Sequence, residues 1–191
     1  MTKFLLIFFL VLFSCSKDNE ACADSELDLN CGNVIYPKQK KSPYVLPWGI
    51  GKTYNVSQGN CSDRSHSEGS YNQFGYYFNM QIGNEIVAIR SGVVIALEES
   101  NTDNEKGSKD ALKNNYIQIE HEDGTTASYM HLTFNGVLKN LEGNVYQEER
   151  IALSGNTGWS TGPHLHLQVN ELFDYKYVGI LITFKNTKPH C

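Results

Sequence analysis

Two histidines separated by a single residue could do chemistry in this chain. His164 and His166 flank Leu165, and side chains at positions i and i+2 of a β-strand project from the same face. Two imidazoles on one face can share a metal ion, or they can divide metal binding and proton transfer between them. By itself such a pair is more often two polar side chains on the wet face of a strand, so the neighbouring segments decide its interpretation.

The segments before this pair favour a functional interpretation. Residues 154–163 are rich in Gly and end in Pro163, which predicts a tight loop whose backbone can approach a site closely. Further upstream, His131 comes near the end of a run of strand-forming residues. Asp123 and Gly124 precede that run, and an Asp-Gly pair is a strong hairpin signal because it supports positive φ. The sequence therefore predicts that strands position all three histidines.

Strand signals dominate the chain from Trp48 onward. Apolar and β-branched runs predict strands at residues 86–89, 93–97, 116–121, 125–132, 164–169 and 180–184. The polar stretch 100–114 predicts a long exposed loop, and only residues 137–150 could carry a short helix. We therefore expect one all-β domain over residues 46–191, with an antiparallel sheet core, long loops and little helix.

These segments together resemble the lysostaphin/LytM-type zinc endopeptidases, which cut peptidoglycan cross-bridges and stem peptides. The resemblance is carried by residues 115–121, 123–125, 129–132, 151–158 and 160–166. With residues 83–94 added, it covers most of the chain between residues 60 and 170. It implies the β-sheet core of that family, a duplicated hybrid motif, with one zinc ion as cofactor and a peptidoglycan peptide as substrate.

The resemblance also implies roles for individual side chains. In that family, zinc is held by a first His, an Asp and the second His of the His-x-His pair, so His66 and His166 would be metal ligands. His131 and His164 would be the catalytic pair that assists the metal-bound water and the transition state. Zinc lowers the pKa of its water to about 7 and polarises the scissile carbonyl, and an imidazole nearby can accept the proton.

The acidic ligand of that family has no acidic counterpart here. The alignment that brings Gly83 and the strand at 86–88 into register places Asn79 at the Asp position, whereas a shorter spacing would place Ser70 there. Asn79 offers one neutral amide oxygen in place of an anion, so zinc would be held less tightly. Amide oxygens do ligate metals, although they mainly ligate harder cations.

Three interpretations of this substitution stay open. In the first, Asn79 still coordinates, or Glu68 or Asp63 substitutes for it, and the protein is a working zinc metalloendopeptidase. In the second, the domain is catalytically weak or inactive and binds peptidoglycan or regulates a cell-wall hydrolase. In the third, it is a structural surface lipoprotein. The first is favoured because all four histidines of the pattern are present together.

Residues around the histidines have predicted roles of their own. Trp159 lies inside the Gly-rich loop beside His164, and with Thr157 it is expected to line a groove for the substrate peptide. His121 is expected to be an exposed residue at a strand end, and His190 a tail residue.

The N-terminus predicts export. A basic residue followed by the apolar run at 4–13 has the form of a signal peptide over residues 1–14, and the run is shorter than the roughly 20 residues of a membrane-spanning helix. Residues 12–15 resemble a lipoprotein cleavage box. We therefore expect a lipid on Cys15, a tether over residues 15–45 and anchoring to a bacterial membrane, at the outer membrane or cell surface. Plain secretion, or a periplasmic location, stays the alternative.

The cysteine and charge counts agree with this location. The chain has five Cys, and with Cys15 on lipid an even number remains in an oxidising compartment. Among the possible pairings we expect Cys22 with Cys31 and Cys61 with Cys191. Lys and Arg total 16 against 21 Asp and Glu, a net charge of −5, which argues against binding to nucleic acid.

Overall fold

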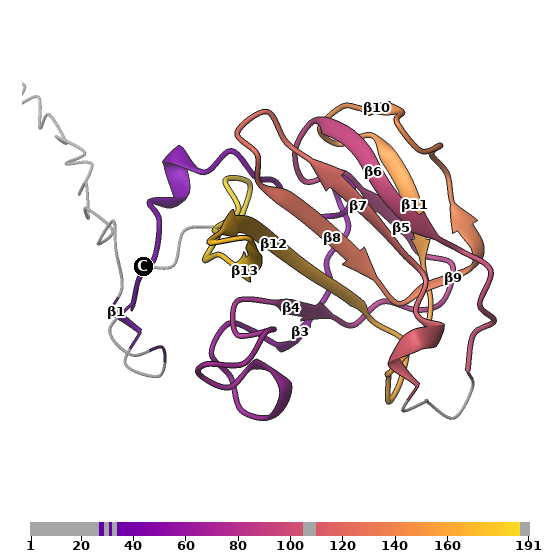
Figure 1. The fold of residues 1–191 in the computed structure, drawn as a ribbon, viewed down its shortest axis with the longest axis horizontal. Helices are drawn as coiled ribbons and strands as arrows, with labels where there is room; N and C mark the ends of the chain where they lie inside the picture. The colour runs from indigo at the N-terminus through magenta and orange to yellow at the C-terminus, as the bar shows by residue number, and fades with distance from the viewer. Residues whose placement is uncertain (1–26, 29–30, 32–33, 105–109, 188–191) are drawn as a thin grey trace, which may run out of the picture.

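The fold is built almost entirely from antiparallel strands (Figure 1). The computed structural model describes residues 27–28, 31, 34–104 and 110–187. Its strands are β1 (Leu27–Asp28), β2 (Val34–Ile35), β3 (Val56–Gln58), β4 (Tyr76–Phe78), β5 (Glu85–Val87), β6 (Gly92–Glu98), β7 (Tyr116–Glu120), β8 (Thr126–Met130), β9 (Leu132–Val137), β10 (Asn144–Val145), β11 (Arg150–Ser154), β12 (Leu165–Phe173) and β13 (Lys176–Gly179). Three short 3-10 turns are η2 (Gln39–Lys41), η3 (Arg64–His66) and η4 (Ala111–Lys113). None of the helical segments in these ranges has the length and apolar character needed to cross a membrane.

The strands of the described residues form one large sheet and two smaller ones. The large sheet has the order β10-β6-β7-β8-β12-β4-β3, with β13 paired to β12, and the second sheet has the order β5-β11-β9. A two-stranded ribbon of β1 and β2 stands apart from them. The strand β12 is central, because β8 pairs with one of its edges and β4 and β13 with the other.

Apolar side chains from both larger sheets make a single core. Ile117, Tyr129 and Leu167 come from the large sheet, and Ile86 and Ile151 from the smaller one, and all are fully buried. The predicted antiparallel all-β fold is therefore confirmed. It arises because strands such as β7 and β12 alternate apolar and polar residues, so that one face of the large sheet can pack on the smaller sheet.

Successive side chains of β12 point alternately into the core and toward the face that carries the histidines. Leu165, Leu167 and Val169 point into the core, so His166 and Gln168 project from the opposite face. The register pairs His166 with Met130 and Gln168 with Ser128 on β8. The site therefore lies on the polar face of the large sheet.

Local sequence signals predicted one of the connections between strands correctly and two other segments wrongly. The Asp-Gly hairpin is confirmed, because β7 and β8 flank a turn in which Gly124 has φ +81°. The stretch 137–150 forms no helix, since it contains the end of β9, a turn and β10. Residues 180–184 form no strand, although Ile182 and Phe184 are buried in the core.

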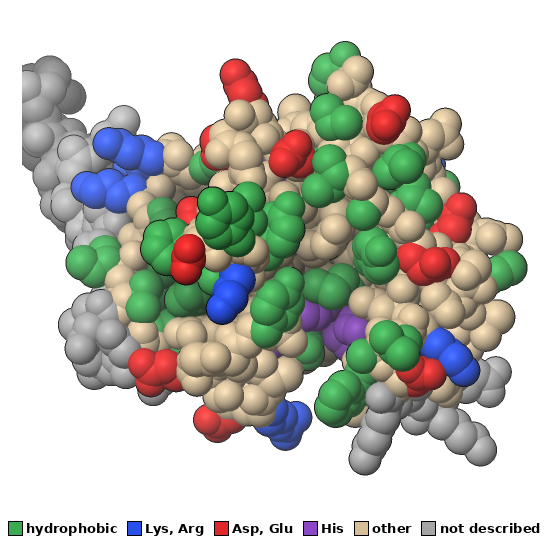
Figure 2. Space-filling model, viewed as in Figure 1, with side chains coloured by type: hydrophobic (Ala, Val, Ile, Leu, Met, Phe, Trp, Pro, Cys, Tyr) green, Lys and Arg blue, Asp and Glu red, His purple; other side chains and the backbone are tan. Residues whose placement is uncertain are grey.

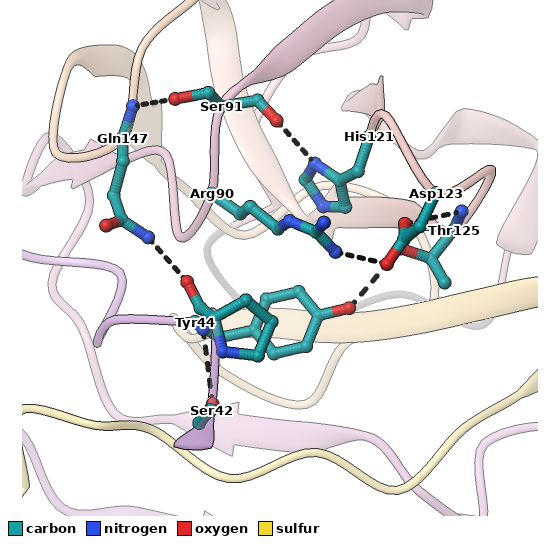
Figure 3. Close-up of polar contacts among 9 residues, drawn as sticks. Ser42, Tyr44, Arg90, Ser91, His121, Asp123, Thr125 and Gln147 are labelled. Carbon is teal, nitrogen blue, oxygen red and sulfur yellow. Dashed lines mark hydrogen bonds and ion pairs between the residues drawn. The ribbon is translucent and has the colours of Figure 1, made fainter. Parts of the chain in front are cut away.

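The second half of the predicted tether packs on the domain. The backbone N–H of Val45 donates to the carbonyl of Ile89 at 2.9 Å, and that of Lys185 donates to the carbonyl of Tyr44 at 2.9 Å. Figure 3 shows Tyr44 next to Arg90, whose guanidinium pairs with Asp123 at 2.5 Å. The chain entering the domain is thus held against both the hairpin at Asp123 and the C-terminal segment.

A disulfide joins Cys31 to Cys61, with Cα atoms 5.1 Å apart. The predicted pairs of Cys22 with Cys31 and Cys61 with Cys191 are therefore wrong, because each uses a cysteine that is already bonded. Proximity in the fold, which sequence spacing does not reveal, selects the partner. Cys15, Cys22 and Cys191 lie outside the described residues.

Candidate metal and catalytic site

Four histidines lie together at one end of the polar face. His66 ends η3, His131 lies between β8 and β9, His164 directly precedes β12 and His166 lies within it. The ring centroids of His131 and His164 are 4.6 Å apart, and that of His166 is 5.8 Å from both His66 and His131. Figure 2 shows histidine surface in a hollow between groups of hydrophobic side chains. The four candidate ligands and catalytic residues are thus neighbours, and their roles stay predictions.

Backbone carbonyls fix the same tautomer in three of these rings, with the proton on Nδ1. A carbonyl oxygen can only accept a hydrogen bond, so the ring nitrogen facing it must carry the proton. The Nδ1–H groups of His66, His131 and His164 donate to the carbonyls of Gly59 at 2.9 Å, Thr157 at 2.7 Å and Gly162 at 2.8 Å, respectively. In the neutral ring this leaves the Nε2 lone pair free, and such an anchored Nδ1–H is typical of histidines that ligate a metal through the other nitrogen.

The imidazoles are neutral, and several have a ring nitrogen without a hydrogen-bond partner. The Nε2 atoms of His66, His164 and His166 are buried and have no hydrogen-bond partner among the described residues. Burial lowers the pKa of all three rings, that of His166 most strongly, and it lowers the pKa of His131 to about 3. Buried polar atoms without partners are rare and call for an explanation. Free lone pairs on neutral imidazoles are suitable donors for zinc.

The backbone at His131 is held in an uncommon conformation. Its φ is +64°, a region that costs energy for a residue other than Gly. The side chain of Asn114 accepts its backbone N–H at 3.0 Å, and a Cβ on Gly158 would lie only 2.7 Å from the Cβ of Asn114. The Gly-rich loop therefore approaches the site closely, as the sequence predicts, and supports the corner that presents His131.

Tyr77 is the residue that faces this cluster from β4. The register pairs Tyr77 directly with His166. Its ring centroid lies 4.4 Å from that of His66, 4.5 Å from that of His164 and 4.7 Å from that of His166. Its hydroxyl is 3.2 Å from the hydroxyl of Ser65, and burial raises its pKa. A phenol ring thus lies in contact with three of the four imidazoles.

Sequence reasoning counted Tyr77 among several aromatic residues that could line a substrate groove and did not place it against the histidines, although the signal was present. Phe78 and Met80 are fully buried core residues, and strand alternation then places Tyr77 on the opposite face, toward the histidines. Asn79 lies just past the end of β4, is exposed, and forms no hydrogen bond with the buried Nε2 atoms of the cluster. Coordination of zinc by Asn79 therefore stays a prediction.

The alternative ligands considered from the sequence, Asp63, Glu68 and Ser70, are not grouped with the histidines. Asp63 and Glu68 are exposed on the loop around His66, and the hydroxyl of Ser70 donates to the carbonyl of Ser65 at 2.9 Å. Within the described ranges, no group of three or more His, Cys, Asp or Glu is arranged to hold a metal ion. The cluster thus supplies nitrogen donors of the kind that zinc takes, but among the described residues these donors are not arranged around one point and no anionic ligand joins them.

The candidate groove residues differ in their exposure. Trp159 is 62% exposed and remains a groove candidate. Thr157 is fully buried, and its hydroxyl donates to the carbonyl of Leu132 at 2.8 Å. Its side chain therefore cannot line an open groove, and that expectation is wrong because the hydroxyl is committed to the packing of the loop. The carbonyl of Thr157 instead orients His131.

His121 is part of a second polar cluster and not of this one. It is 3% exposed, which contradicts the expectation of an exposed strand-end residue. Its Nδ1–H donates to the carbonyl of Ser91 at 2.9 Å, and its ring centroid lies 5.9 Å from that of Tyr44, because the incoming chain covers this end of the sheet (Figure 3). His190 lies outside the described residues.

Comparisons with known proteins agree with this arrangement. The sequence profile of peptidase family M23 matches residues 71–178, a range that includes Tyr77 and three of the four histidines. An uncharacterized metalloprotease of Buchnera aphidicola subsp. Baizongia pistaciae is 35% identical over 129 residues, which are 68% of this chain and 30% of that protein. The peptidoglycan DD-endopeptidase ShyA of Vibrio cholerae is 35% identical over 95 residues, 50% of this chain and 19% of that protein.

A solved structure adds a likeness of fold. A zinc containing peptidase from Vibrio cholerae superimposes with a TM-score of 0.52 at 25% identity, covering 81% of this chain and 44% of that one. The matched segments thus make up less than a third of the two sequence relatives and less than half of the structural neighbour.

Proposed function

The chain belongs to peptidase family M23, and from that premise we propose that it is a zinc metalloendopeptidase that cleaves peptide bonds in peptidoglycan stem peptides or cross-bridges. The observation that carries this proposal is the cluster of four neutral imidazoles, three of which keep a buried Nε2 without a partner among the described residues. Buried polar atoms without partners are rare, and three of them on neighbouring imidazoles call for an explanation.

The geometry suggests a division of roles among the histidines. His66 and His166, which face each other across the cluster, would hold the zinc. When bound, zinc supplies Lewis-acid polarisation of the scissile carbonyl. His131 and His164 are neutral and anchored through Nδ1, so each can accept a proton or a hydrogen bond at Nε2 from the reacting groups. Trp159 would contact the substrate peptide.

The zinc would be weakly held. Two neutral imidazoles leave the full positive charge of the ion uncompensated, and the side chain that faces them from β4 is a phenol in place of a carboxylate. An acidic ligand favours the bound ion electrostatically. We therefore expect zinc to exchange readily and to be lost during purification in chelators.

We place the protein outside the cytoplasm. The Cys31–Cys61 disulfide is of a kind that persists in oxidising compartments, and peptidoglycan lies in the cell envelope. Residues 1–14 would be the signal peptide, Cys15 the lipidated residue and residues 46–191 the catalytic domain. Residues 15–45 would connect the lipid to the domain, and the second half of this segment packs on the domain. Anchoring through Cys15 would hold the domain at the outer membrane or the cell surface.

Two measurements test the function. Zinc content is determined in full-length protein purified without chelators, and purified sacculi are then incubated with the zinc-loaded protein. We expect stoichiometric zinc that is lost in His66→Ala, together with release of peptides from the sacculi. Protein that takes up no zinc at micromolar concentrations, or that releases no peptide when loaded, would contradict the proposal.

Tyr77 favours a second candidate, in which the domain binds peptidoglycan or regulates a cell-wall hydrolase without cutting. A ring that fills the cluster is compatible with a surface that recognises a peptide but does not cleave it. Sedimentation with sacculi separates the two candidates. Binding without peptide release at saturating zinc supports the second, whereas release of new peptide ends supports the first.

A further inference from the structure

The phenol ring of Tyr77 occupies the space between the histidines. Its centroid is within 4.4–4.7 Å of the centroids of His66, His164 and His166, which is the contact distance of aromatic rings. Zinc must approach each imidazole nitrogen to about 2.0–2.1 Å. An aromatic ring in contact with three imidazoles leaves little room for an ion between them.

The hydroxyl of Tyr77 does not act as a donor within the cluster. Its hydrogen-bond partner is the hydroxyl of Ser65, at 3.2 Å, whereas the Nε2 atoms of the three contacting histidines have no partner among the described residues. The side chain therefore contributes the bulk of its ring and no oxygen ligand.

Apart from its contacts with the histidines, the side chain of Tyr77 is held by one hydrogen bond, to Ser65. The Ser65 hydroxyl is exposed, and a hydrogen bond of this kind contributes about 1 kcal/mol. Tyr77 is itself partly exposed, and the β3–β4 pairing beside it is irregular, with a register shift between Val56 and Gln58. The ring can therefore leave the cluster without loss of the core, because the apolar side chains of β4 point the other way.

We propose that Tyr77 competes with zinc for the space between the histidines, so that the ring must move out before a metal is bound. This inference deepens the proposed zinc-dependent function and rests on it. Tyr77 adds a steric competitor to a group of histidines that has no acidic ligand, and it thereby sets the metal affinity of the site. In this role Tyr77 is neither a ligand nor a catalytic residue.

Zinc affinity in four variants tests this proposal without reference to catalysis. The full-length protein and the variants Tyr77→Phe, Tyr77→Ala, Tyr77→Asp and Asn79→Asp are titrated with zinc against a chromogenic chelator. Tyr77→Phe keeps the ring and loses the hydroxyl, whereas Tyr77→Ala loses both. Asn79→Asp is the comparison variant, because it adds the same charge as Tyr77→Asp at the other candidate ligand position.

Competition between the Tyr77 ring and zinc predicts a particular order of zinc affinities among the variants. We expect Tyr77→Phe to bind zinc as the unchanged protein does, and Asn79→Asp to gain less affinity than Tyr77→Asp. We expect Tyr77→Ala to bind about tenfold more tightly, and Tyr77→Asp about 100-fold or more, since changes around metal ligands alter affinity by about 10–100-fold. The zinc-induced rise in melting temperature should follow the same order, which also shows that each variant is folded.

Opposite outcomes overturn the proposal. A loss of zinc affinity in Tyr77→Phe or Tyr77→Ala would make Tyr77 a ligand, and equal affinity in Tyr77→Ala and the unchanged protein would make the ring irrelevant. Tighter binding in Asn79→Asp than in Tyr77→Asp would return the ligand position to residue 79. A failure of the proposed function gives a different result from a failure of this inference. In that case the zinc-loaded protein does not cleave sacculi, whatever the order of zinc affinities among the variants.

Discussion

Tyr77 and His166 are directly paired on adjacent antiparallel strands, and their ring centroids lie 4.7 Å apart. This pairing places a neutral aromatic side chain against the second histidine of the His-x-His pair. The strand that supplies it, β4, also supplies Phe78 to the core. The short strand β4 therefore supplies one residue to the core and the next one to the candidate metal site.

The division of roles among the histidines predicts separable effects. His66→Ala should abolish zinc binding and cleavage together. His131→Ala should reduce cleavage of sacculi by about 10²–10⁴-fold, the usual contribution of a general acid–base group, and should leave zinc affinity unchanged. Zinc titration and peptide release are measured on the same preparations. Equal loss of zinc in both variants would refute the assignment of His131.

Gly75 should be needed for the position of His166. A Cβ at residue 75 would lie 3.0 Å from Nε2 of His166 and 3.2 Å from Oε1 of Gln168. We expect Gly75→Ala to shift the imidazole, to weaken zinc binding about tenfold and to lower the free energy of unfolding by about 1–3 kcal/mol. Zinc titration and denaturant unfolding measure the two effects.

The matched control for that change is Gly49→Ala. A Cβ at residue 49 would have no atom within 4 Å, and no positive φ restricts the position. We expect both zinc affinity and stability to stay at the level of the unchanged protein. A similar loss in both variants would mean that the contact at His166 is unimportant.

The Cys31–Cys61 disulfide should stabilise the domain. It closes a loop with a sequence separation of 30, and a crosslink of this size reduces the entropy of the unfolded chain by an amount worth about 3–4 kcal/mol. Cys31→Ser should therefore lower the melting temperature, and a reducing agent should lower it in the unchanged protein. Cys22→Ser is the control, and we expect no change there because Cys31 is already paired. A lower melting temperature in Cys22→Ser would contradict the observed pairing.

The Arg90–Asp123 ion pair should make stability depend on acid pH. Burial raises the pKa of Asp123, but hydrogen bonds from Arg90 and Thr125 outweigh it and lower this pKa from 3.8 to about 2 (Figure 3). Because the folded-state pKa is the lower one, the contribution is complete above the unfolded value of 3.8 and is lost as the pH falls toward 2. Its size is small, since the carboxylate is about half exposed.

Asp123→Asn tests this dependence. We expect the free energy of unfolding of the unchanged protein to fall more steeply than that of the variant between about pH 4 and pH 2. Denaturant unfolding at several pH values gives the two slopes. Parallel curves would show that the ion pair does not contribute to the folded state.

Local patterns were sufficient for much of the fold. The alternation around His164 and His166 predicted that both side chains leave the core face, and the Asp123-Gly124 pair predicted the β7–β8 hairpin, because both signals depend only on residues close in sequence. The same patterns failed at residues 180–184, where apolar side chains reach the core from an irregular segment. Burial alone does not distinguish a strand from a packed loop.

Which residues meet depends on the folding of distant segments onto one another. Residue types and short spacings were enough to predict the family resemblance, the all-β class and the four candidate histidines. The disulfide partner of Cys61 and the position of Tyr77 against His166 depend on pairing between segments far apart in the chain. A shift of two residues in strand register keeps every side chain on its face and still exchanges Asn79 for Tyr77. For that reason the alternation of side chains predicts which face a residue lies on, and only the pairing of the strands identifies the residue at the candidate metal site.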